Sequence, residues 1–594
     1  MNTTGRKTGQ GCGRCGAIAL AVVIAAAAGM AADTAQAAAP PATPAPGVAG
    51  LPPVTGDTDH LFGIYLAAKQ AQGQRDFRTA GAWFAKALAQ DPTSPELISR
   101  TFLMDISTGD FDRARKLAPE ALKIDPSDAL PQLVLLVTKL KAGDTAGALQ
   151  SATALPQDGL HRFVAPLALA WTRAASGDTA GADTALQGLD KYNGFAPLKE
   201  FQLGLIYDYA NQPTNAETHF AKALAAAGTL NWRLTDAVAR FDERHGHPEK
   251  AQALYRKFIK ETGGSELARS VLATRPAGTP PPLVHTPADG LAEGMFDLAS
   301  VLNQAETMDL ALIYDRFALE LRPQFPLAQL LLADALSTGN KPAESLAVLQ
   351  TIPQTSPYRW SADLRAAADL DTVGRTDEAI ALLTKMSQAS PKLAGAELEL
   401  GDLLRNKKRF TEAVVAYDEA IRRAAANGEP ERWAPFYDRG VALERAHQWA
   451  RAEGDLLHAL KLRPNQPLVL NYLGYSWIDR GEHLARGLKM IEKAVELRPD
   501  DGYIIDSLGW AHYRMGDYTG AVQYLEKAVE LVPEDPTINA HLGDAYWQVG
   551  RLTEARYQWR RALQFGPEPK EIKPLEAKLE RGLTAAPATP EHGG

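Results

Sequence analysis

Two neighbouring segments near the C-terminal end of the chain align with each other at a spacing of 34 residues. GYIIDSLGWAHYRMGDYTGAVQYLEKAVELVPED begins at residue 502, and PTINAHLGDAYWQVGRLTEARYQWRRALQFGPEP begins at residue 536. The positions at which both segments have the same residue include Leu508/Leu542, Gly509/Gly543, Gly516/Gly550, Ala521/Ala555, Ala528/Ala562 and Pro533/Pro567. A fixed period of this length is typical of a repeat array, in which each unit packs mainly against its neighbours.

The same period extends through most of the 594-residue chain, with one extra residue in the unit from 467 and five in the unit from 394. In the second half, further units begin near residues 467, 433, 394, 360, 326 and 292. In the first half, units begin near residues 61, 95, 129, 163, 197 and 231. There a small residue recurs at one position of each unit, as Ala80, Ala114, Ala148, Ala182, Ala216 and Ala251. The sequence therefore predicts six units before residue 265 and eight after residue 291.

Each unit has the pattern of two amphipathic helices joined by a short turn. A glycine or a polar residue marks the middle of the unit, as at Gly516 and Gly550, and glycine is favoured where a helix ends. Proline closes many units, as at Pro533 and Pro567, and prevents the second helix from continuing. Small residues let the two helices approach, and large residues such as Trp559 fill the space beside them. One such pair cannot bury its own apolar face, but stacked pairs can.

The predicted domain order follows from this pattern and from its interruptions. The Pro/Ala-rich stretch 38–60 is a predicted disordered tether, and the stretch 265–291, which has five prolines in ATRPAGTPPPLVHTPADG, is a predicted linker. The two predicted solenoid blocks are residues 61–264 and 292–569. Residues 570–583 are a predicted polar capping helix, and residues 584–594 a predicted disordered tail.

The first 37 residues have the pattern of a secretory signal peptide. Basic residues precede the apolar run AIALAVVIAAAAGMAA, and Ala35-Gln36-Ala37 supplies a cleavage pattern. The motif GCGRCG at 11–16 matches both a dinucleotide loop and a C-x-x-C pair, but no strand precedes it and cleavage would remove it. Both cysteines precede the apolar run, so we expect no disulfide and no lipid anchor in the mature chain. An uncleaved anchor in the inner membrane is the alternative interpretation.

The sequence offers little that indicates catalysis or nucleic-acid binding. A formal net charge of −8 disfavours a nucleic-acid partner, which is usually met by a basic face. The chain has no H-E-x-x-H, phosphate-loop or G-x-S-x-G motif. His245 and His247 stand in a turn between two predicted helices, and we interpret them as solvated rather than metal-ligating because no further ligands accompany them. We therefore expect no enzyme activity, no cofactor and no metal.

The shared positions of these units resemble the tetratricopeptide repeat (TPR), and the resemblance extends over nearly all of residues 61–569. It implies an all-α, right-handed α-solenoid of about fourteen helix-turn-helix units in two blocks. It also implies that the first helix of each unit lines a concave groove that binds peptides. Residues of the last three units that fall at groove-facing positions are the candidate binding site: Asn471, Tyr475, Tyr503, Asp506, Trp510, Tyr513, Arg514, Asp544 and Trp547.

Aromatic side chains with a few hydrogen-bonding groups suit an extended peptide, because they provide contact area at a low cost in conformational entropy. The alternative for each of these residues is packing between neighbouring helices. Some TPR proteins bind a C-terminal carboxylate with a set of Lys, Arg and Asn residues, but Asn471 and Arg514 alone do not establish such a set.

The last units resemble more specifically a bacterial envelope group of TPR proteins, through D-S-L-G-W at 506–510, H-L-G-D at 541–544 and the expansion at RGEHLARGL. This group includes an outer-membrane lipoprotein that serves as adaptor for a periplasmic C-terminal processing protease. The resemblance implies a periplasmic scaffold that presents cell-wall hydrolases to such a protease, with peripheral membrane association as an option. The chain lacks the lipobox of that relative. The alternative function is a scaffold subunit of an envelope assembly or polysaccharide export machine.

Overall fold

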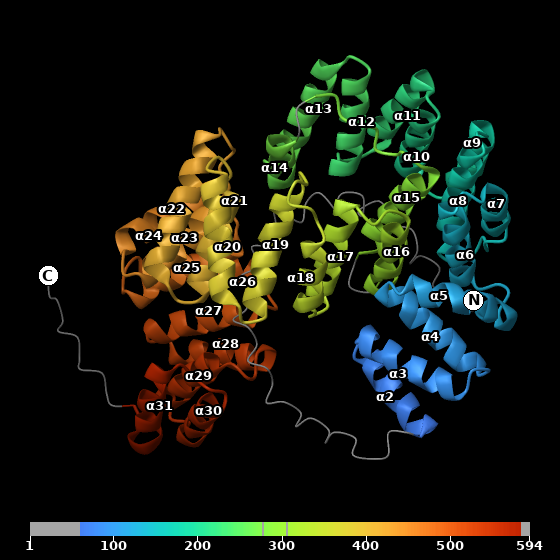
Figure 1. The fold of residues 1–594 in the computed structure, drawn as a ribbon. Helices are drawn as coiled ribbons and strands as arrows, with labels where there is room; N and C mark the ends of the chain where they lie inside the picture. The colour runs from blue at the N-terminus through green and yellow to red at the C-terminus, as the bar shows by residue number, and fades with distance from the viewer. Residues whose placement is uncertain (1–59, 276–277, 304–306, 584–594) are drawn as a thin grey trace, which may run out of the picture. The chain divides into compact units, whose positions relative to one another are not determined.

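The computed structural model of the chain describes residues 60–275, 278–303 and 307–583. These residues form thirty α-helices and one short 3-10 helix, and no strand occurs among them (Figure 1). The predicted all-α repeat fold is confirmed. The predicted signal peptide with GCGRCG, nearly all of the predicted tether and the predicted tail lie outside the described residues.

The helices alternate between the first and second helix of successive units. The first block contains the helices α2 (Leu61–Gly73), α3 (Phe77–Gln90), α4 (Pro95–Thr108), α5 (Phe111–Ile124), α6 (Ala129–Lys141), α7 (Thr145–Thr153), α8 (His161–Ala175), α9 (Thr179–Leu186), the 3-10 helix η1 (Gln187–Lys191), α10 (Ala196–Tyr209), α11 (Pro213–Ala226), α12 (Trp232–Arg244) and α13 (Pro248–Glu261). A single helix, α14 (Glu266–Thr274), follows this block.

The second block repeats the arrangement and ends in a further single helix. Its helices are α15 (Pro287–Leu302), α16 (Met308–Leu321), α17 (Pro326–Thr338), α18 (Pro342–Gln350), α19 (Arg359–Thr372), α20 (Thr376–Ala389), α21 (Gly395–Asn406), α22 (Phe410–Ala426), α23 (Trp433–Arg445), α24 (Trp449–Leu462), α25 (Pro467–Asp479), α26 (Leu484–Leu497), α27 (Gly502–Arg514), α28 (Tyr518–Leu531), α29 (Pro536–Gln548) and α30 (Leu552–Gln564). The last helix, α31 (Pro569–Arg581), lies in the interval where the sequence predicts a cap.

The positions that define the period have the roles that helix-pair packing requires. The six recurring alanines of the first block, Ala80 to Ala251, are fully buried. Gly516 and Gly550 have φ values of 85° and 83°, a left-handed conformation that glycine adopts without a steric penalty. Large side chains such as Trp559 fill the interior between helices. The sequence period therefore arises from the packing of each first helix on its second helix.

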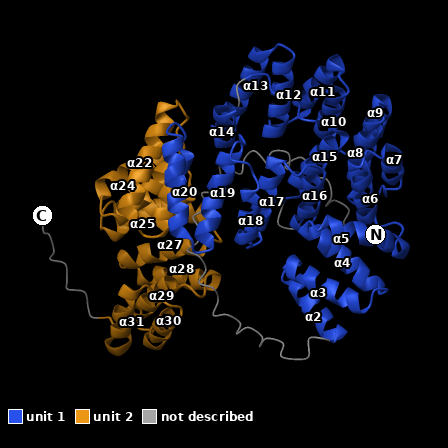
Figure 2. Cartoon of the chain, in the orientation of Figure 1, with its two compact units in different colours: residues 1–399 blue, residues 400–594 orange. Residues whose placement is uncertain are grey.

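The chain divides into two compact units, Met1–Glu399 and Leu400–Gly594 (Figure 2). We call them unit 1 and unit 2. The Pro-rich interval 265–291, which the sequence predicts to be a linker, lies inside unit 1 and contains α14 and the start of α15. Helix α15 begins at Pro287 because Thr286 and Asp289 form a capping box, and proline is favoured in the first turn of a helix.

Within unit 1, the second block packs against the first. Helix α15 packs on α6, α8 and α10, and α16 packs on α4 and α6 (Figure 1). All four of these helices are first helices of their units. Four of the six first helices of the first block, which the resemblance places along the peptide groove, are therefore in contact with helices of the same chain.

Small and aromatic residues make this contact close. The backbone of α15 lies against the indole of Trp171 at Gly290, where a Cβ atom would come within 2.2 Å of the ring. One turn further, a Cβ at Gly294 would meet Leu167 at 3.4 Å, an ordinary contact distance. On α16, Phe317 packs edge-to-face on Phe111, with ring centroids 5.2 Å apart.

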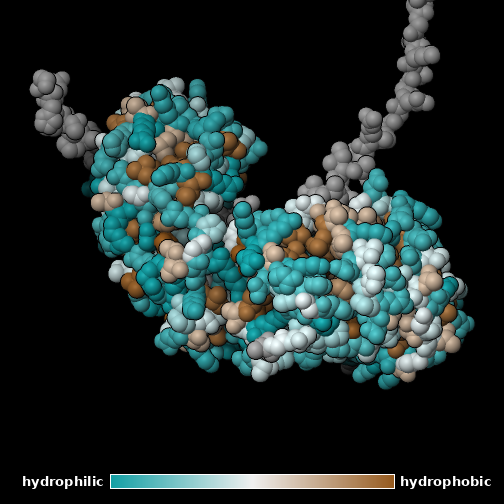
Figure 3. Space-filling view, turned by 90° about the horizontal axis from the view of Figure 1, so that it is seen from above, coloured by the Kyte–Doolittle hydropathy of each residue, from teal (hydrophilic) through white to brown (hydrophobic). Residues whose placement is uncertain are grey.

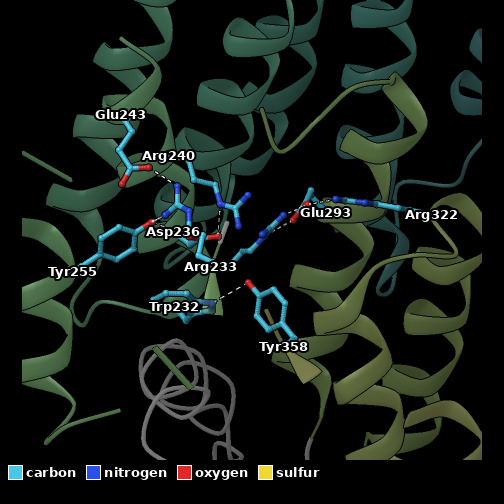
Figure 4. Close-up of polar contacts among 10 residues, drawn as sticks. Trp232, Arg233, Asp236, Arg240, Glu243, Tyr255, Glu293, Arg322 and Tyr358 are labelled. Carbon is cyan, nitrogen blue, oxygen red and sulfur yellow. Dashed lines mark hydrogen bonds and ion pairs between the residues drawn. The ribbon is translucent and has the colours of Figure 1, made fainter. Parts of the chain in front are cut away.

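A buried polar network also joins the two blocks (Figure 4). Arg233 of α12 donates to both carboxylate oxygens of Glu293 of α15, with Nε at 2.6 Å from Oε2, and Arg322 donates to Oε1 at 2.9 Å. Arg233 is 8% exposed and Glu293 is 0% exposed. Nearby, the Trp232 indole donates to the hydroxyl of Tyr358 at 3.1 Å. These bonds join α12 to α15 and to Tyr358 at the start of α19, and they join α15 to Arg322 at the end of α16.

In unit 2, the helix pairs stack around a continuous series of apolar contacts. The last cluster contains Leu525, Leu542, Trp559 and Leu575, and Leu575 comes from α31. Hydrophilic residues cover most of the face drawn in Figure 3. No helix within the described ranges is both long and apolar enough to span a membrane.

Candidate protein-binding site

The nine predicted site residues lie on three first helices of unit 2, namely α25, α27 and α29. On α27, Tyr503, Asp506, Trp510 and Tyr513 follow one another at steps of three or four residues. Side chains at these steps share one face of an α-helix. The sequence therefore determines that α27 presents these residues together, and contacts with α25 and α29 determine which of them stay open.

A stack of three rings forms the centre of the site. The indole of Trp510 lies parallel to the ring of Tyr513, with centroids 4.7 Å apart and planes at 9°. The imidazole of His541, from α29, stacks on Trp510 at 4.0 Å and 17°. Trp510 and Tyr513 are both only partly buried. Together they supply the kind of flat, rigid apolar surface that peptides use at interfaces.

His541 was not among the predicted site residues, and it is held by one that was. The Nδ1 atom of His541 lies 2.9 Å and 3.1 Å from the two carboxylate oxygens of Asp506, which is 7% exposed. Burial favours the neutral imidazole, but the charge of Asp506 and its hydrogen bond outweigh burial, so the pKa of His541 is raised above its ordinary value. The motif H-L-G-D contained the signal, since it places a histidine 35 residues after Asp506.

This ion pair leads to a pH prediction for unit 2. A histidine with a raised pKa contributes stability that is fully present below its unfolded pKa of about 6.5 and is lost as the pH rises through its folded pKa. We expect the opening free energy of α27 and α29, measured by hydrogen exchange on the full chain, to fall by about 1 kcal/mol across that range. Asp506→Asn should remove this pH dependence, and Asp500→Asn, a change of an exposed acid, should preserve it. An unchanged pH dependence in Asp506→Asn would contradict the assignment.

Arg514 is engaged by its neighbour on α25. Its guanidinium pairs with the carboxylate of Asp479 and donates to the Asp479 carbonyl oxygen at 2.9 Å. Both side chains are at least one-third exposed, and an exposed pair of this kind contributes only about 0–1 kcal/mol. A carboxylate from a partner can therefore replace Asp479 at small cost.

Asp544 and Trp547 contact the last two helices of unit 2 and the residue that follows them, rather than an open groove. The carboxylate of Asp544 accepts a hydrogen bond from the Trp559 indole at 2.8 Å and pairs with Lys578 of α31 at 2.7 Å. A Cβ at Gly582 would come within 1.9 Å of the Trp547 ring, so the chain after α31 lies directly against that ring. No sequence pattern indicates this arrangement, because it depends on where α31 docks.

The remaining predicted residues are divided between open and packed positions. The side chain of Tyr503 is 43% exposed. Tyr475 packs against the cluster of Ile478, Leu508 and Ala511, and burial raises its pKa. Asn471 Oδ1 and Trp510 Nε1 are buried and have no hydrogen-bond partner among the described residues. The open part of the site therefore consists of Tyr503, Trp510, Tyr513 and Arg514.

No set of three or more His, Cys, Asp or Glu side chains in the described ranges is arranged to hold a metal ion. The Nδ1 atom of His245, one of the two turn histidines, lies 2.8 Å from the carbonyl oxygen of Phe241, and its ring is tilted by 32° against the phenyl ring of Phe241 with centroids 4.2 Å apart.

Stacked helix pairs with an aromatic strip on three successive first helices define an α-helical repeat protein. The family model for the tetratricopeptide repeat matches residues 364–430 and 507–568. These two segments of the chain are therefore tetratricopeptide repeats.

Sequence and structure comparisons give the following similarities. A TPR repeat-containing protein of Pseudomonas aeruginosa is 32% identical over 124 residues, which are 21% of this chain and 20% of that protein, so the match spans about a fifth of that relative. The crystal structure of the APC/C hetero-tetramer Cut9–Hcn1 is 15% identical and aligns with a TM-score of 0.38 over 88% of this chain and 96% of that chain. YrrB, described as a TPR protein with an unusual peptide-binding site, is 22% identical with a TM-score of 0.25 over 29% of this chain and 86% of its own.

Proposed function

We propose that this chain is a non-enzymatic scaffold that binds protein partners on the strip formed by Tyr503, Trp510, Tyr513 and Arg514. Proteins built from tetratricopeptide repeats generally bind other proteins and are generally non-catalytic. The observation that carries the proposal is the stack of Trp510 on Tyr513 and His541, because it forms a rigid, partly exposed aromatic surface next to an exchangeable Arg514. Such surfaces are where interface energy is concentrated.

We further propose that the mature chain acts in the periplasm and presents substrates to a processing protease there. The signal-like pattern of residues 1–37 and the resemblance of the last units to an envelope adaptor support this proposal. In this role the partner segment would be extended, with an apolar side chain on the Trp510–Tyr513 surface and a carboxylate near Arg514. The alternative, a scaffold for polysaccharide export, would use the same strip with a different partner.

A crosslinking pull-down of the full chain from periplasmic extract tests this function. We expect the double variant Trp510→Ala/Tyr513→Ala to capture at least about tenfold less partner protein than the wild type. Truncating a central aromatic anchor typically costs more than about 1 kcal/mol of binding free energy, and the variant truncates two. Tyr557→Ala is the matched control, since Tyr557 is 54% exposed and lies on a second helix outside the strip. Circular dichroism would verify that all variants are folded.

The identity of the captured proteins separates the two roles. A protease together with cell-wall hydrolases would support the adaptor role, whereas polysaccharide-export proteins alone would favour the alternative. Equal capture by the wild type and the double variant would show that the strip is not the binding surface. Mass spectrometry of the captured chain would reveal cleavage after Ala37 if the signal is processed.

A further inference from the structure

A partly open pocket of about 210 Å³ lies in unit 1, where the first block meets the second. It is lined by the start of α10, the start of α12, the end of α15, and single leucines of α14 and α17. Most of its wall is apolar and aromatic, with Phe195, Phe201, Trp232, Phe296 and Val301 among the lining residues. An engineered apolar cavity of about 150 Å³ is large enough to bind benzene, so this pocket has room for a ring with a short chain.

One carboxylate lies in this apolar wall and is held in a fixed orientation. The indole of Trp171 donates to Oε1 of Gln202 at 2.8 Å, and Nε2 of Gln202 donates to Oδ2 of Asp297 at 2.9 Å. Trp171 and Gln202 are both fully buried. The bond from the indole determines which end of the Gln202 amide faces Asp297. One carboxylate oxygen of this partly buried residue is therefore hydrogen-bonded to Gln202, and the other has no protein partner within the described ranges.

No cation of the protein pairs with Asp297 in the described ranges. The pocket has one other charged lining residue, Arg233 of α12, and its guanidinium donates to both oxygens of Glu293. Glu293 lies on the same helix as Asp297, one turn earlier, and its negative charge disfavours a second one nearby. Burial together with the charge of Glu293 raises the pKa of Asp297 to about 8, although Gln202 and Arg233 act in the opposite direction.

The Asp297 carboxylate lies in an apolar wall and has one oxygen without a protein partner and no counter-ion in the described ranges. It therefore favours a ligand with a positively charged hydrogen-bond donor. A buried charge is stabilised by an opposite charge that also donates a hydrogen bond. The rest of the wall would be stabilised by contact with hydrocarbon. Acidic ligands are disfavoured by repulsion from Asp297, and strongly polar ligands would lose hydration without regaining hydrogen bonds.

We propose that this pocket binds an apolar amine, a molecule whose aromatic or aliphatic body fills the aromatic-lined space and whose single ammonium group donates to Asp297. This site lies in unit 1 and is separate from the protein-binding strip of unit 2. It gives the scaffold a small-molecule site at the junction of its two blocks, bordered by α10, α12 and α15.

Calorimetry with three probes of the same shape tests the charge requirement. At pH 8.5 we expect the full chain to bind 2-phenylethylamine at least about tenfold more tightly than 2-phenylethanol, since a hydrogen bond between charged groups is stronger than a neutral one. We expect no measurable binding of 3-phenylpropionate. Equal affinities for the amine and the alcohol, tighter binding of the acid, or no binding of any probe would each overturn the proposal.

Two variants and one control assign the binding to this pocket. Asp297→Asn preserves the shape of the side chain and should reduce the affinity for 2-phenylethylamine to that for 2-phenylethanol. Val301→Trp should fill the space and abolish binding of both probes. Asp377→Asn, a change of an exposed acid on α20, should bind all probes as the wild type does. Undiminished amine binding in either pocket variant would overturn the proposal.

The pH dependence gives an independent measurement. The charged groups that face Asp297 are Glu293 of its own helix and Arg233 of α12, while α10 contributes the neutral Gln202. At pH values below the pKa of Asp297 its carboxyl group is protonated, and an ammonium ligand can pair with it only after that proton is lost. We therefore expect 2-phenylethylamine to bind several-fold more weakly at pH 6.5 than at pH 8.5, with the alcohol unaffected. Equal amine affinity at the two pH values would contradict the assigned carboxylate.

Discussion

Glu293→Ala is expected to lower the unfolding free energy of unit 1 by about 3–5 kcal/mol. The substitution leaves Arg233, which is 8% exposed, buried without the carboxylate that accepts its two hydrogen bonds. It also removes one partner of Arg322. That side chain is more exposed than Glu293, and its ion pair with Asp289, with Nε 3.8 Å from Oδ1, remains. The cost therefore arises mainly from a stranded guanidinium in the centre of the network drawn in Figure 4. Urea unfolding of the full chain, with hydrogen exchange to assign the change to α12 and α15, would measure it.

Two further variants distinguish a stranded charge from simple loss of contact. The double variant Arg233→Met/Glu293→Leu should recover most of the loss, because replacing a buried ion pair by apolar residues is often neutral or stabilising. Glu378→Ala breaks the exposed pair of Arg375 and Glu378 and should change stability by less than about 0.5 kcal/mol. If the single and double variants at Arg233 and Glu293 were equally unstable, burial of the charge would not be the cause.

Gly290→Ala is expected to destabilise unit 1 by about 1–3 kcal/mol or more and to loosen α15 from the first block. The new Cβ would come within 2.2 Å of the Trp171 ring, and Trp171 is fully buried and hydrogen-bonded to Gln202. The ring has no free space to move into, so the helix must shift away from α8. Faster hydrogen exchange in both α8 and α15 would reveal this separation.

Gly294→Ala is the matched control on the same helix. Its new Cβ would meet the side chain of Leu167 at 3.4 Å, which is ordinary van der Waals contact. An alanine in a helix interior is also favoured over glycine by about 1 kcal/mol. We expect this variant to be as stable as the wild type or slightly more stable. Equal destabilisation by the two substitutions would contradict the packing of α15 against Trp171.

The period of the sequence was sufficient to predict the helix pairs. A unit that repeats every 34 residues must place its small and large residues at fixed positions, and Ala80, Ala216 and Ala251 are all fully buried as the pattern requires. On α27, the steps of three and four residues between Tyr503 and Tyr513 were sufficient to place these side chains on one face. Such features depend on residues close together in the sequence.

Contacts between distant units could not be predicted in this way. Asp544 has the same spacing as a groove residue, yet it holds Trp559 and Lys578, and only the docking of α31 reveals this. The prolines of 265–291 have no period, and the repeat pattern does not indicate that Arg233 before this segment pairs with Glu293 after it. A repeat pattern describes how neighbours stack, and it contains no information about which remote helices meet.

Because α15 and α16 pack on first helices of the first block, a segment of this chain occupies surface that an external partner would otherwise use. A segment tied to its binding surface acts at an effective concentration in the millimolar range, so an external partner for that surface would have to outcompete it. The number of repeats is therefore a poor guide to the number of partners that the chain can hold. Among the described first helices, those of unit 1 that contact α15 and α16 therefore have less surface open to an external partner than first helices without such a contact.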